Sequence, residues 1–342
     1  MKNVREAMLW RKAEGREVEC FLCAHRCRIA EGKRGVCQVR ENRGGTLYTL
    51  VYGLSISRNV DPIEKKPLFH FHPGSTSLSI ATVGCNFRCL HCQNADISQL
   101  PRNGGGRIVG EWFPPEAVVE AAKRTGARGI SYTYTEPTVF FEYARDTMEL
   151  AHQAGLLNNF VTNGYMTREA LDAMDGLLDG ANVDLKSFSE EFYRRVCGAR
   201  LEPVLETLRA MKEKGVWVEV TTLVISGEND SPEELRRIAE FVLSLGPETP
   251  WHVTAFHPTY KMTDRPPTRV ETLREARRLG LEAGLRYVYS GNVPGDEGEN
   301  TFCHHCGKKI IERYGFSVSN RNVREGACAF CGTVVAGVEM GE

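Results

Sequence analysis

The sequence predicts an α/β fold, namely an incomplete (βα)6-type barrel flanked by small N-terminal and C-terminal cysteine-rich metal modules. Two observations lead to this fold class. Short, β-rich apolar runs alternate with amphipathic helical stretches through the middle of the chain, a pattern typical of a parallel sheet. The 342 residues also exceed the about 200–250 residues of a barrel domain, which leaves room for additions at both ends.

Seven apolar runs are expected to form the strands. They are residues 77–83, 129–134, 157–162, 181–185, 217–225, 252–256 and 287–290. Helices are expected between them at residues 115–125, 139–154, 167–178, 201–214 and 231–245. Ser231 begins a capping box, with Pro232 at the first helical position, and Gly155 and Gly215 end two other helices. Active residues of such a barrel lie at the carboxyl ends of its strands.

The cysteines set the expected domain organisation. Eleven of the twelve fall into three groups, and only Cys197 stands alone, as a core cysteine at a helix end. The expected units are an N-terminal four-cysteine module (residues 1–45), a connector (46–76), the partial barrel (77–295) and a zinc-ribbon-like module (296–342). Because no export signal is readable, these thiols are expected to bind metal rather than form disulfides.

The central group consists of Cys85, Cys89 and Cys92, directly after the first predicted strand. Three thiolates cannot close a tetrahedral site, but they can hold a [4Fe–4S] cluster with one iron left open for a ligand. An iron that is open to a ligand indicates a catalytic cluster. The alternative is a zinc site completed by His91 or a distant residue, although structural zinc sites more usually pair two knuckles.

The C-terminal group has the spacing of a zinc ribbon. Cys303 and Cys306 form one C-x2-C knuckle, and Cys328 and Cys331 form a second one, with 21 residues between the two. This spacing is close to that of known zinc sites, and four ligands leave no position for a substrate. We therefore expect structural zinc here, with a rubredoxin-like iron as a minor alternative.

The N-terminal group, Cys20, Cys23, Cys27 and Cys37, leaves the metal open. Its spacing suits zinc or a second iron–sulfur cluster, and His25 could replace one thiolate. The segment has few strongly apolar residues, so the metal would supply much of its folding energy. The connector at 61–74 is expected to pack as a linker, or else to line the mouth of the substrate site.

The central run Cys85-Asn86-Phe87-Arg88-Cys89-Leu90-His91-Cys92 resembles the cluster motif of the radical S-adenosylmethionine (SAM) superfamily. The resemblance implies that the open iron of a [4Fe–4S] cluster binds the amine and carboxylate of SAM. It further implies reductive cleavage of SAM to a 5′-deoxyadenosyl radical, which abstracts hydrogen from a substrate. Cys85, Cys89 and Cys92 would then be catalytic.

The same resemblance implies cofactor-binding roles for residues at later strand ends. Glu136, in a variant of a Gly-Gly-Glu-Pro motif that lacks both glycines, would accept the SAM ammonium group, and the Asn163 amide would bind the ribose hydroxyls or the methionyl carboxylate. Asp184-Leu185-Lys186 resembles the Asp-x-Lys segment of the pyruvate formate-lyase-activating enzyme group, with both charged residues on one strand face. His257 sits where that group has a cofactor-contacting histidine. The alternative for each is a turn or capping residue.

From residue 20 to 290 the chain resembles the radical SAM enzymes of the AmmeMemoRadiSam system, which are pyruvate formate-lyase-activating-enzyme-like. Asp61-Pro62-Ile63-Glu64-Lys65-Lys66-Pro67 contributes to this resemblance. It implies AMMECR1-like and Memo-like domain proteins as partners and an external electron donor such as flavodoxin or ferredoxin. The substrate is left unidentified, with a glycyl-radical protein as the leading specific hypothesis.

Composition excludes some functions. The 43 Lys and Arg balance 44 Asp and Glu, so a nucleic-acid partner is not indicated. No apolar run long enough for a membrane span is present, and a cytoplasmic location is expected. Two alternatives stay open: a non-catalytic multi-cluster iron–sulfur electron-transfer protein, and a radical SAM enzyme that modifies RNA or a small molecule.

Overall fold

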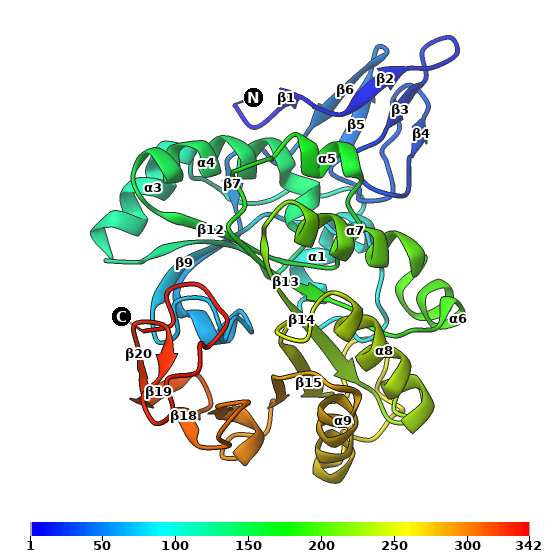
Figure 1. Ribbon diagram of the computed structural model, residues 1–342. Coiled ribbons are helices and arrows are strands. Elements are labelled where there is room, and N and C mark those ends of the chain that lie inside the picture. The colour runs from blue at the N-terminus through cyan, green and yellow to red at the C-terminus, as the bar shows by residue number, and fades with distance from the viewer. Residues whose placement is uncertain (1, 342) are drawn as a thin grey trace.

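The computed structural model describes residues 2–341, the side chains of residues 320 and 321 excepted. An eight-stranded sheet lies at its centre (Figure 1). Seven parallel strands follow in the order β16 (Val288–Gly291), β15 (Trp251–Ala255), β14 (Trp217–Val224), β13 (Gly180–Asp184), β12 (Leu157–Thr162), β11 (Gly129–Tyr132) and β9 (Thr76–Ala81). Each expected strand is present, so the predicted partial barrel is confirmed.

An eighth strand, β8 (Ser57–Pro62), extends the sheet beyond the first predicted strand. It pairs antiparallel with β9, from Ser57 opposite Ala81 to Pro62 opposite Thr76. The sequence analysis assigned this segment to the connector. In the structure three consecutive residues of the strand are exposed, so it has no continuous apolar face. An edge strand can be polar in this way because only one of its sides pairs with a neighbour.

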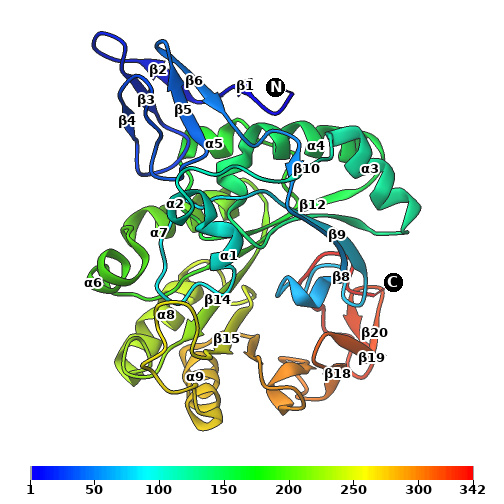
Figure 2. The ribbon, with the colours of Figure 1, turned by 180° about the vertical axis from the view of Figure 1, so that it is seen from behind.

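Helices follow the parallel strands and cover the sheet (Figures 1 and 2). They are α3 (Pro115–Arg124), η2 (Pro137–Phe140) with α4 (Phe141–Gln153), α5 (Arg168–Asp172), α7 (Glu202–Glu213), α8 (Pro232–Ser244) and α9 (Val270–Ala283). The helix expected at 167–178 is only the short α5. Thr167 caps its start, and turns replace the helix before Gly176, which has a φ of 71°. The sequence reading did not propose α9.

One apolar core joins the helices to the sheet. Val118, Met148, Leu208, Ile238 and Leu273 come from the helices, and Ile130, Phe160, Val183, Val220 and Val253 come from the strands; all are buried. The strands are buried on both faces, as parallel strands under helices must be. Among the residues described, no helix is long and apolar enough to cross a membrane.

The N-terminal module consists of two small antiparallel sheets. One contains β1 (Arg5–Glu6), β6 (Thr46–Thr49) and β5 (Arg40–Arg43), and the other β2 (Trp10–Lys12), β3 (Val18–Cys20) and β4 (Arg28–Ile29). Strand β6 carries the module past residue 45, where the sequence reading placed its end. Its apolar residues, including Val18, Ile29 and Leu47, belong to the main core. A two-stranded ribbon of β7 (Leu54–Ser55) and β10 (Glu111–Trp112) follows.

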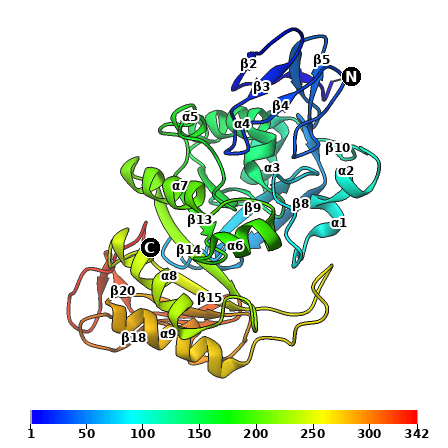
Figure 3. The same cartoon turned by 90° about the vertical axis from the view of Figure 1, so that its right-hand side faces the viewer.

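The C-terminal module lies at the opposite end of the molecule (Figures 1 and 3). After η4 (Glu297–Glu299) it contains β17 (Thr301–Phe302), β18 (Lys309–Tyr314) and β19 (Ser317–Arg321), then β20 (Val323–Arg324) paired with β21 (Ala327–Cys328). Ile310, Ile311 and Val323 form a core of their own with Phe69 and Tyr289. The module therefore packs on the connector and on the edge strand β16.

Candidate functional site

A cavity of about 420 Å³ opens at the carboxyl ends of the parallel strands. The loop that follows β9 contributes the three central cysteines, and the ends of the other six parallel strands contribute Thr133, Asn163, Asp184, Leu223, Thr254 and Asn292, among others. Its size falls within the about 300–1,000 Å³ of small-molecule sites. The cavity lies at the edge of the sheet where the sequence places the active residues.

The three cysteines of the central group lie together in this cavity as free thiols. The Cys85 sulfur accepts a hydrogen bond from the Phe87 backbone N–H at 3.3 Å, and the Cys92 sulfur lies 3.2 Å from the Ser98 hydroxyl. His91, which precedes Cys92 in the sequence, is buried, and both of its ring nitrogens lack a hydrogen-bond partner among the described residues. Burial lowers the His91 pKa to about 3. Soft thiolate ligands beside an open space fit an iron–sulfur cluster with one open position.

The loop of the central group is held from behind by a π-helical turn, η3 (Tyr193–Cys197). The Arg88 N–H donates to the Cys197 carbonyl at 2.9 Å, and the Leu90 N–H donates to the Val196 carbonyl at 3.0 Å. Cys197 itself is fully buried and does not line the cavity. Burial, aided by the neighbouring Cys89, raises the Cys197 pKa well above its ordinary value, so the thiol is neutral. This agrees with the expectation of a core cysteine.

Glu136 organises the ends of β11 and β12. Its carboxylate accepts hydrogen bonds from the Thr138 N–H at 3.0 Å, the Thr162 hydroxyl at 2.7 Å and the Asn163 N–H at 2.8 Å. Burial raises the pKa of Glu136, while these donors act in the opposite direction. One oxygen, Oε2, accepts the Asn163 N–H and therefore has capacity for a further donor.

Asn163 connects Glu136 to the central group. Its side-chain amide donates to the Asn86 side-chain oxygen at 2.7 Å and lies 3.8 Å from the Cys85 sulfur. The strand end therefore places an amide beside the first cysteine of the loop, in addition to the turn role that an Asn-Gly pair would have by itself.

Asp184 and Lys186 form an ion pair at the end of β13, with 2.9 Å between the Asp184 Oδ2 and the Lys186 Nζ. Burial opposes the charge on Lys186, but Asp184 and the nearby thiols hold its pKa well above the ordinary value. Lys186 is therefore cationic. Both residues line the cavity, as their two-residue spacing on one strand face predicts.

The structure does not bring His257 into this cavity. It follows β15 in the stretch from residue 256 to 269 and is exposed to solvent. The same stretch does touch the loop of the central group, because the Lys261 N–H donates to the Leu90 carbonyl at 3.0 Å. Glu136, Asn163, Asp184 and Lys186 are therefore brought together with the cysteines, and His257 is not.

The sequence analysis did not predict a second charged cluster in the cavity wall. Lys65 and Lys66 line the cavity and pair with Asp61 at 2.9 Å and 2.7 Å. The Tyr134 hydroxyl also donates to Asp61, and these donors hold the Asp61 pKa below its ordinary value despite partial burial. The aromatic and histidine side chains of the connector, such as Phe69 and His70, are buried and do not line the cavity, so they pack as a linker, whereas Lys65 and Lys66 line the cavity.

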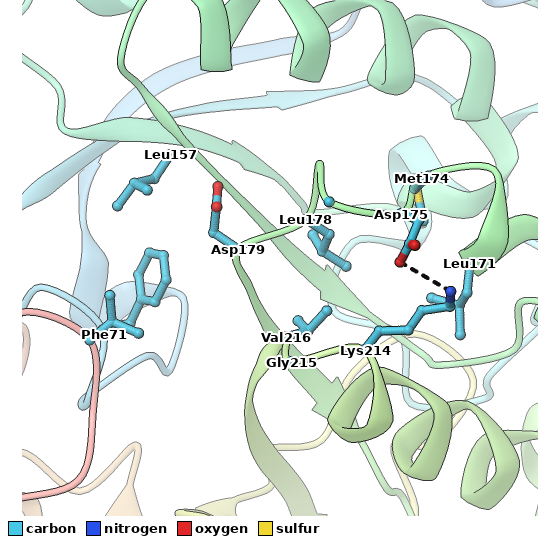
Figure 4. A pocket seen from close by; sticks show the side chains of 12 residues that line it. Phe71, Leu157, Leu171, Met174, Asp175, Leu178, Asp179, Lys214, Gly215 and Val216 are labelled. Atoms are coloured by element: carbon cyan, nitrogen blue, oxygen red, sulfur yellow. Dashed lines mark hydrogen bonds and ion pairs between the residues drawn. The ribbon is translucent and has the colours of Figure 1, made fainter.

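A second cavity, of about 340 Å³, lies at the other edge of the sheet, where β12, β13 and β14 begin (Figure 4). Aliphatic and aromatic side chains such as Leu157 and Phe71 line it, and Lys214 pairs with Asp175 at 3.1 Å on its rim. It contains no cysteine. Active residues of barrels lie at the opposite, carboxyl edge, so we assign the site to the cysteine-lined cavity.

The four C-terminal cysteine sulfurs lie within 4.8 Å of one another. Cys303 and Cys331 are 3.7 Å apart, and Cys306 and Cys328 are 3.8 Å apart. These distances match the edges of a tetrahedron of sulfurs about 2.3 Å from a central ion. The predicted C-terminal site could therefore hold a metal ion.

Comparison with known proteins assigns the family. A family model described as the radical SAM superfamily matches residues 79–242, which contain most of the residues that line the cavity. The chain carries a radical SAM superfamily domain. It belongs to one family with the uncharacterized protein MJ0808 of Methanocaldococcus jannaschii, to which it is 50% identical over 332 residues, or 96% of this chain and 98% of that protein.

More distant relatives agree. The chain is 23% identical over 220 residues to the pyruvate formate-lyase 1-activating enzyme of Escherichia coli, covering 60% of this chain and 89% of that one. A crystal structure of a radical SAM methyltransferase from Sphaerobacter thermophilus shares the fold, with a TM-score of 0.50 and 14% identity over 67% of this chain and 71% of that one. The superfamily resemblance is thus confirmed, whereas the AmmeMemoRadiSam assignment stays a prediction.

Proposed function

We propose that this protein is a radical SAM enzyme that cleaves SAM reductively and abstracts hydrogen from a polypeptide substrate. The observation that carries the proposal is the set of three free thiols, Cys85, Cys89 and Cys92, in a cavity where every parallel strand ends. A [4Fe–4S] cluster on these thiols would supply the electron that breaks the sulfonium bond of SAM. An external donor such as flavodoxin or ferredoxin would provide that electron.

The chain's own polar groups would orient SAM. Asn163 stands beside Cys85 and would donate its amide to the methionyl carboxylate or the ribose, while the free capacity of Glu136 Oε2 would accept the ammonium group. The Asp184–Lys186 pair presents one anion and one cation in the same wall. Such fixed groups hold the reacting carbon in one place, so that the radical meets only its intended hydrogen.

His257 enters this proposal on the resemblance alone, because its ring is exposed and outside the cavity lining. Lys66 is a stronger candidate for substrate contact. It is buried, lines the same cavity as the cysteines and is held by Asp61.

The polypeptide substrate is supported by the similarity to the pyruvate formate-lyase 1-activating enzyme, most of whose length aligns with this chain. AMMECR1-like and Memo-like domain proteins are the partners to examine first, and a glycine of a partner enzyme is the leading target. A structural zinc ion would occupy the C-terminal site. A cytoplasmic location belongs to the same proposal.

The test is anaerobic reconstitution with iron and sulfide, followed by SAM and dithionite and by chromatography for 5′-deoxyadenosine. Cys89→Ala should abolish the product, whereas Cys331→Ser, the same loss of a thiol at the far end of the molecule, should retain it. Product formation by Cys89→Ala would refute the assignment. Absence of product from the wild type, despite a reducible cluster, would favour the electron-transfer alternative.

A further inference from the structure

The N-terminal cysteines surround a hollow of their own. Cys20, Cys23, Cys27 and Cys37 line it together with Leu22, Ile29, Gly35, Val36, Arg40 and Val139. No carboxylate or imidazole group lines it, and His25 lies elsewhere, with its ring nitrogen 2.8 Å from the Asn86 carbonyl. A set of four sulfurs in apolar surroundings selects zinc or an iron–sulfur cluster over harder ions.

The spacing of the sulfurs separates these two possibilities. Around one zinc ion four thiolates must crowd together, as the C-terminal sulfurs do. Within residues 2–341 that C-terminal set is the one group close enough to share an ion, and the N-terminal sulfurs do not meet the same condition. Each thiolate of a [4Fe–4S] cluster binds a different iron, so its sulfurs must stand farther apart around a common space. The N-terminal sulfurs are not close enough to share one ion, yet they line one common hollow, and this combination favours the second case.

Arg40 gives an independent observation. Its side chain is 1% exposed, it lines the hollow, and its Nη1 lies 3.6 Å from the Cys20 sulfur. Its Nε has no hydrogen-bond partner among the described residues, although Glu142 and the Met8 carbonyl satisfy other guanidinium donors. A buried donor without a partner is costly unless a ligand accepts it. Sulfide and thiolate sulfurs of an anionic cluster are such acceptors.

The hollow also lies against the loop of the central group. A Cβ atom placed on Gly84, the residue before Cys85, would meet the Cys37 carbonyl at 3.2 Å and Val39 at 2.6 Å. On the other side, His25 contacts Asn86 through the bond described above. Gly84, next to Cys85, therefore leaves no room for a side chain between itself and the backbone of Cys37.

We propose that Cys20, Cys23, Cys27 and Cys37 hold a second [4Fe–4S] cluster rather than zinc, and that this cluster relays electrons to the central group. In each relay step one electron from an external one-electron donor reduces the N-terminal cluster, and the same electron passes on to the cluster at Cys85, Cys89 and Cys92. No bond forms or breaks. The identity of the metal stands independently of SAM cleavage, whereas the relay rests on the proposed function.

Metal analysis of anaerobically prepared protein tests the first part. The triple variant Cys85→Ala, Cys89→Ala, Cys92→Ala should retain about four iron atoms per chain, a single zinc and a paramagnetic resonance signal that SAM does not change. Cys20→Ser with Cys37→Ser should keep about four iron atoms in a cluster whose signal does respond to SAM. If the triple variant contains zinc and no iron, the proposal is overturned. The triple variant leaves the N-terminal module intact, so its iron content tests the proposal even if the Cys20→Ser, Cys37→Ser variant misfolds.

The rate of 5′-deoxyadenosine formation tests the relay. With reduced flavodoxin as donor, the Cys20→Ser, Cys37→Ser variant should be about tenfold or more slower than the wild type, whereas dithionite, a small reductant, should drive both proteins equally. Equal slowing with both reductants would overturn the relay. If even the wild type forms no product, the proposed function fails, and the iron content still decides whether the second cluster exists.

Discussion

The two terminal modules each present four cysteines, yet they differ in geometry and in how they join the barrel. The C-terminal sulfurs gather within 4.8 Å, and their module has a separate apolar core. The N-terminal sulfurs stand around an apolar hollow beside Arg40, and the residues around them belong to the core of the barrel. Cysteine number alone therefore does not fix the metal. The backbone between the cysteines decides how closely the sulfurs can approach.

The largest expected effect is the separate loss of the two metals. A chelator should remove zinc and unfold the C-terminal module alone, because structural zinc supplies about 10–16 kcal/mol of folding free energy in small modules. Air should destroy the proposed N-terminal cluster instead, together with the cluster of the central group, and should loosen the N-terminal module around its cysteines. Limited proteolysis after each treatment measures this: cleavage beyond residue 300 with chelator, and cleavage before residue 50 with air.

The control is the double variant Cys303→Ser, Cys328→Ser, which should reproduce the chelator pattern without any chelator. Identical cleavage patterns after chelator and after air would contradict the contrast between the modules. They would show that both sites bind the same kind of metal.

The next effect concerns one buried arginine in each module. Arg40 pairs with Glu142, and Arg313 lies 3.6 Å from Glu64; all four side chains are at most 2% exposed. Because each substitution leaves a carboxylate buried without its partner, Arg40→Ala and Arg313→Ala should each lower the free energy of unfolding by about 3–5 kcal/mol in urea titrations.

The reduction potential of the proposed N-terminal cluster separates the two arginines. Loss of the cation near the N-terminal sulfurs should make the cluster proposed there harder to reduce, so Arg40→Ala should lower its reduction potential and Arg313→Ala should not. Arg278→Ala, which removes half-exposed ion pairs on α9, is the control, with an expected cost of about 0–1 kcal/mol. An equally small cost for Arg40→Ala would indicate that water reaches Glu142 in the folded protein.

Much of the fold followed from the sequence, because period and length distinguish buried parallel strands from amphipathic helices. The failures have physical causes. Strand β8 is polar and pairs on one side only, α5 is cut short by turns, and α9 follows a stretch of 14 residues with no regular structure after β15. Strand β8 and the turns after α5 produce no periodic apolar pattern, whereas α9 buries Leu273, Ala276 and Leu279 at helical spacing and was recognisable from the sequence.

The site was predictable where neighbouring residues share one strand or loop. Asp184 and Lys186 have fixed two-residue geometry, and the three central cysteines lie within eight residues. Lys66 and Asp61 were not recognisable, because their meeting with Tyr134 depends on how β8 pairs with β9. The exposure of His257 likewise depends on the path of an irregular loop, which the sequence does not specify.

A smaller effect should follow from His70, which ties the connector to the C-terminal module. Its ring nitrogens lie 2.6 Å from the Ala336 carbonyl and 2.5 Å from the Tyr289 hydroxyl. Burial lowers the His70 pKa from 6.5 to about 4. Between these values the unfolded chain binds the proton and the folded protein does not, so this stability is fully present above pH 6.5 and is lost as the pH falls to about 4.

The expected loss is about 3 kcal/mol, from the free energy of a pKa shift of this size. Proteolysis of the C-terminal module as a function of pH measures it. His70→Gln should lower stability at neutral pH and remove the pH dependence across this window, whereas substitution of the exposed His257 should leave it. If His70→Gln kept the same pH profile, the loss of stability at low pH would have to come from carboxylates and not from His70.

The smallest expected effect comes from glycine-to-alanine substitutions at the points where each terminal module packs closely against another segment. Gly84 has a φ of 102°, and a Cβ there would lie 2.6 Å from Val39, so Gly84→Ala should cost about 2–3 kcal/mol through backbone strain and overlap. Gly32→Ala, with a φ of 70° and no atom within 4 Å, should cost about 1 kcal/mol. Urea titration measures both.

In the C-terminal module, Gly337→Ala would place a Cβ 2.6 Å from the His70 carbonyl. If electrons reach the cavity through the N-terminal module, Gly84→Ala should slow flavodoxin-driven SAM cleavage, and Gly337→Ala should destabilise its own module without changing that rate. Equal rates in both variants would mean that close packing between Val39 and Gly84 is not needed for electron transfer.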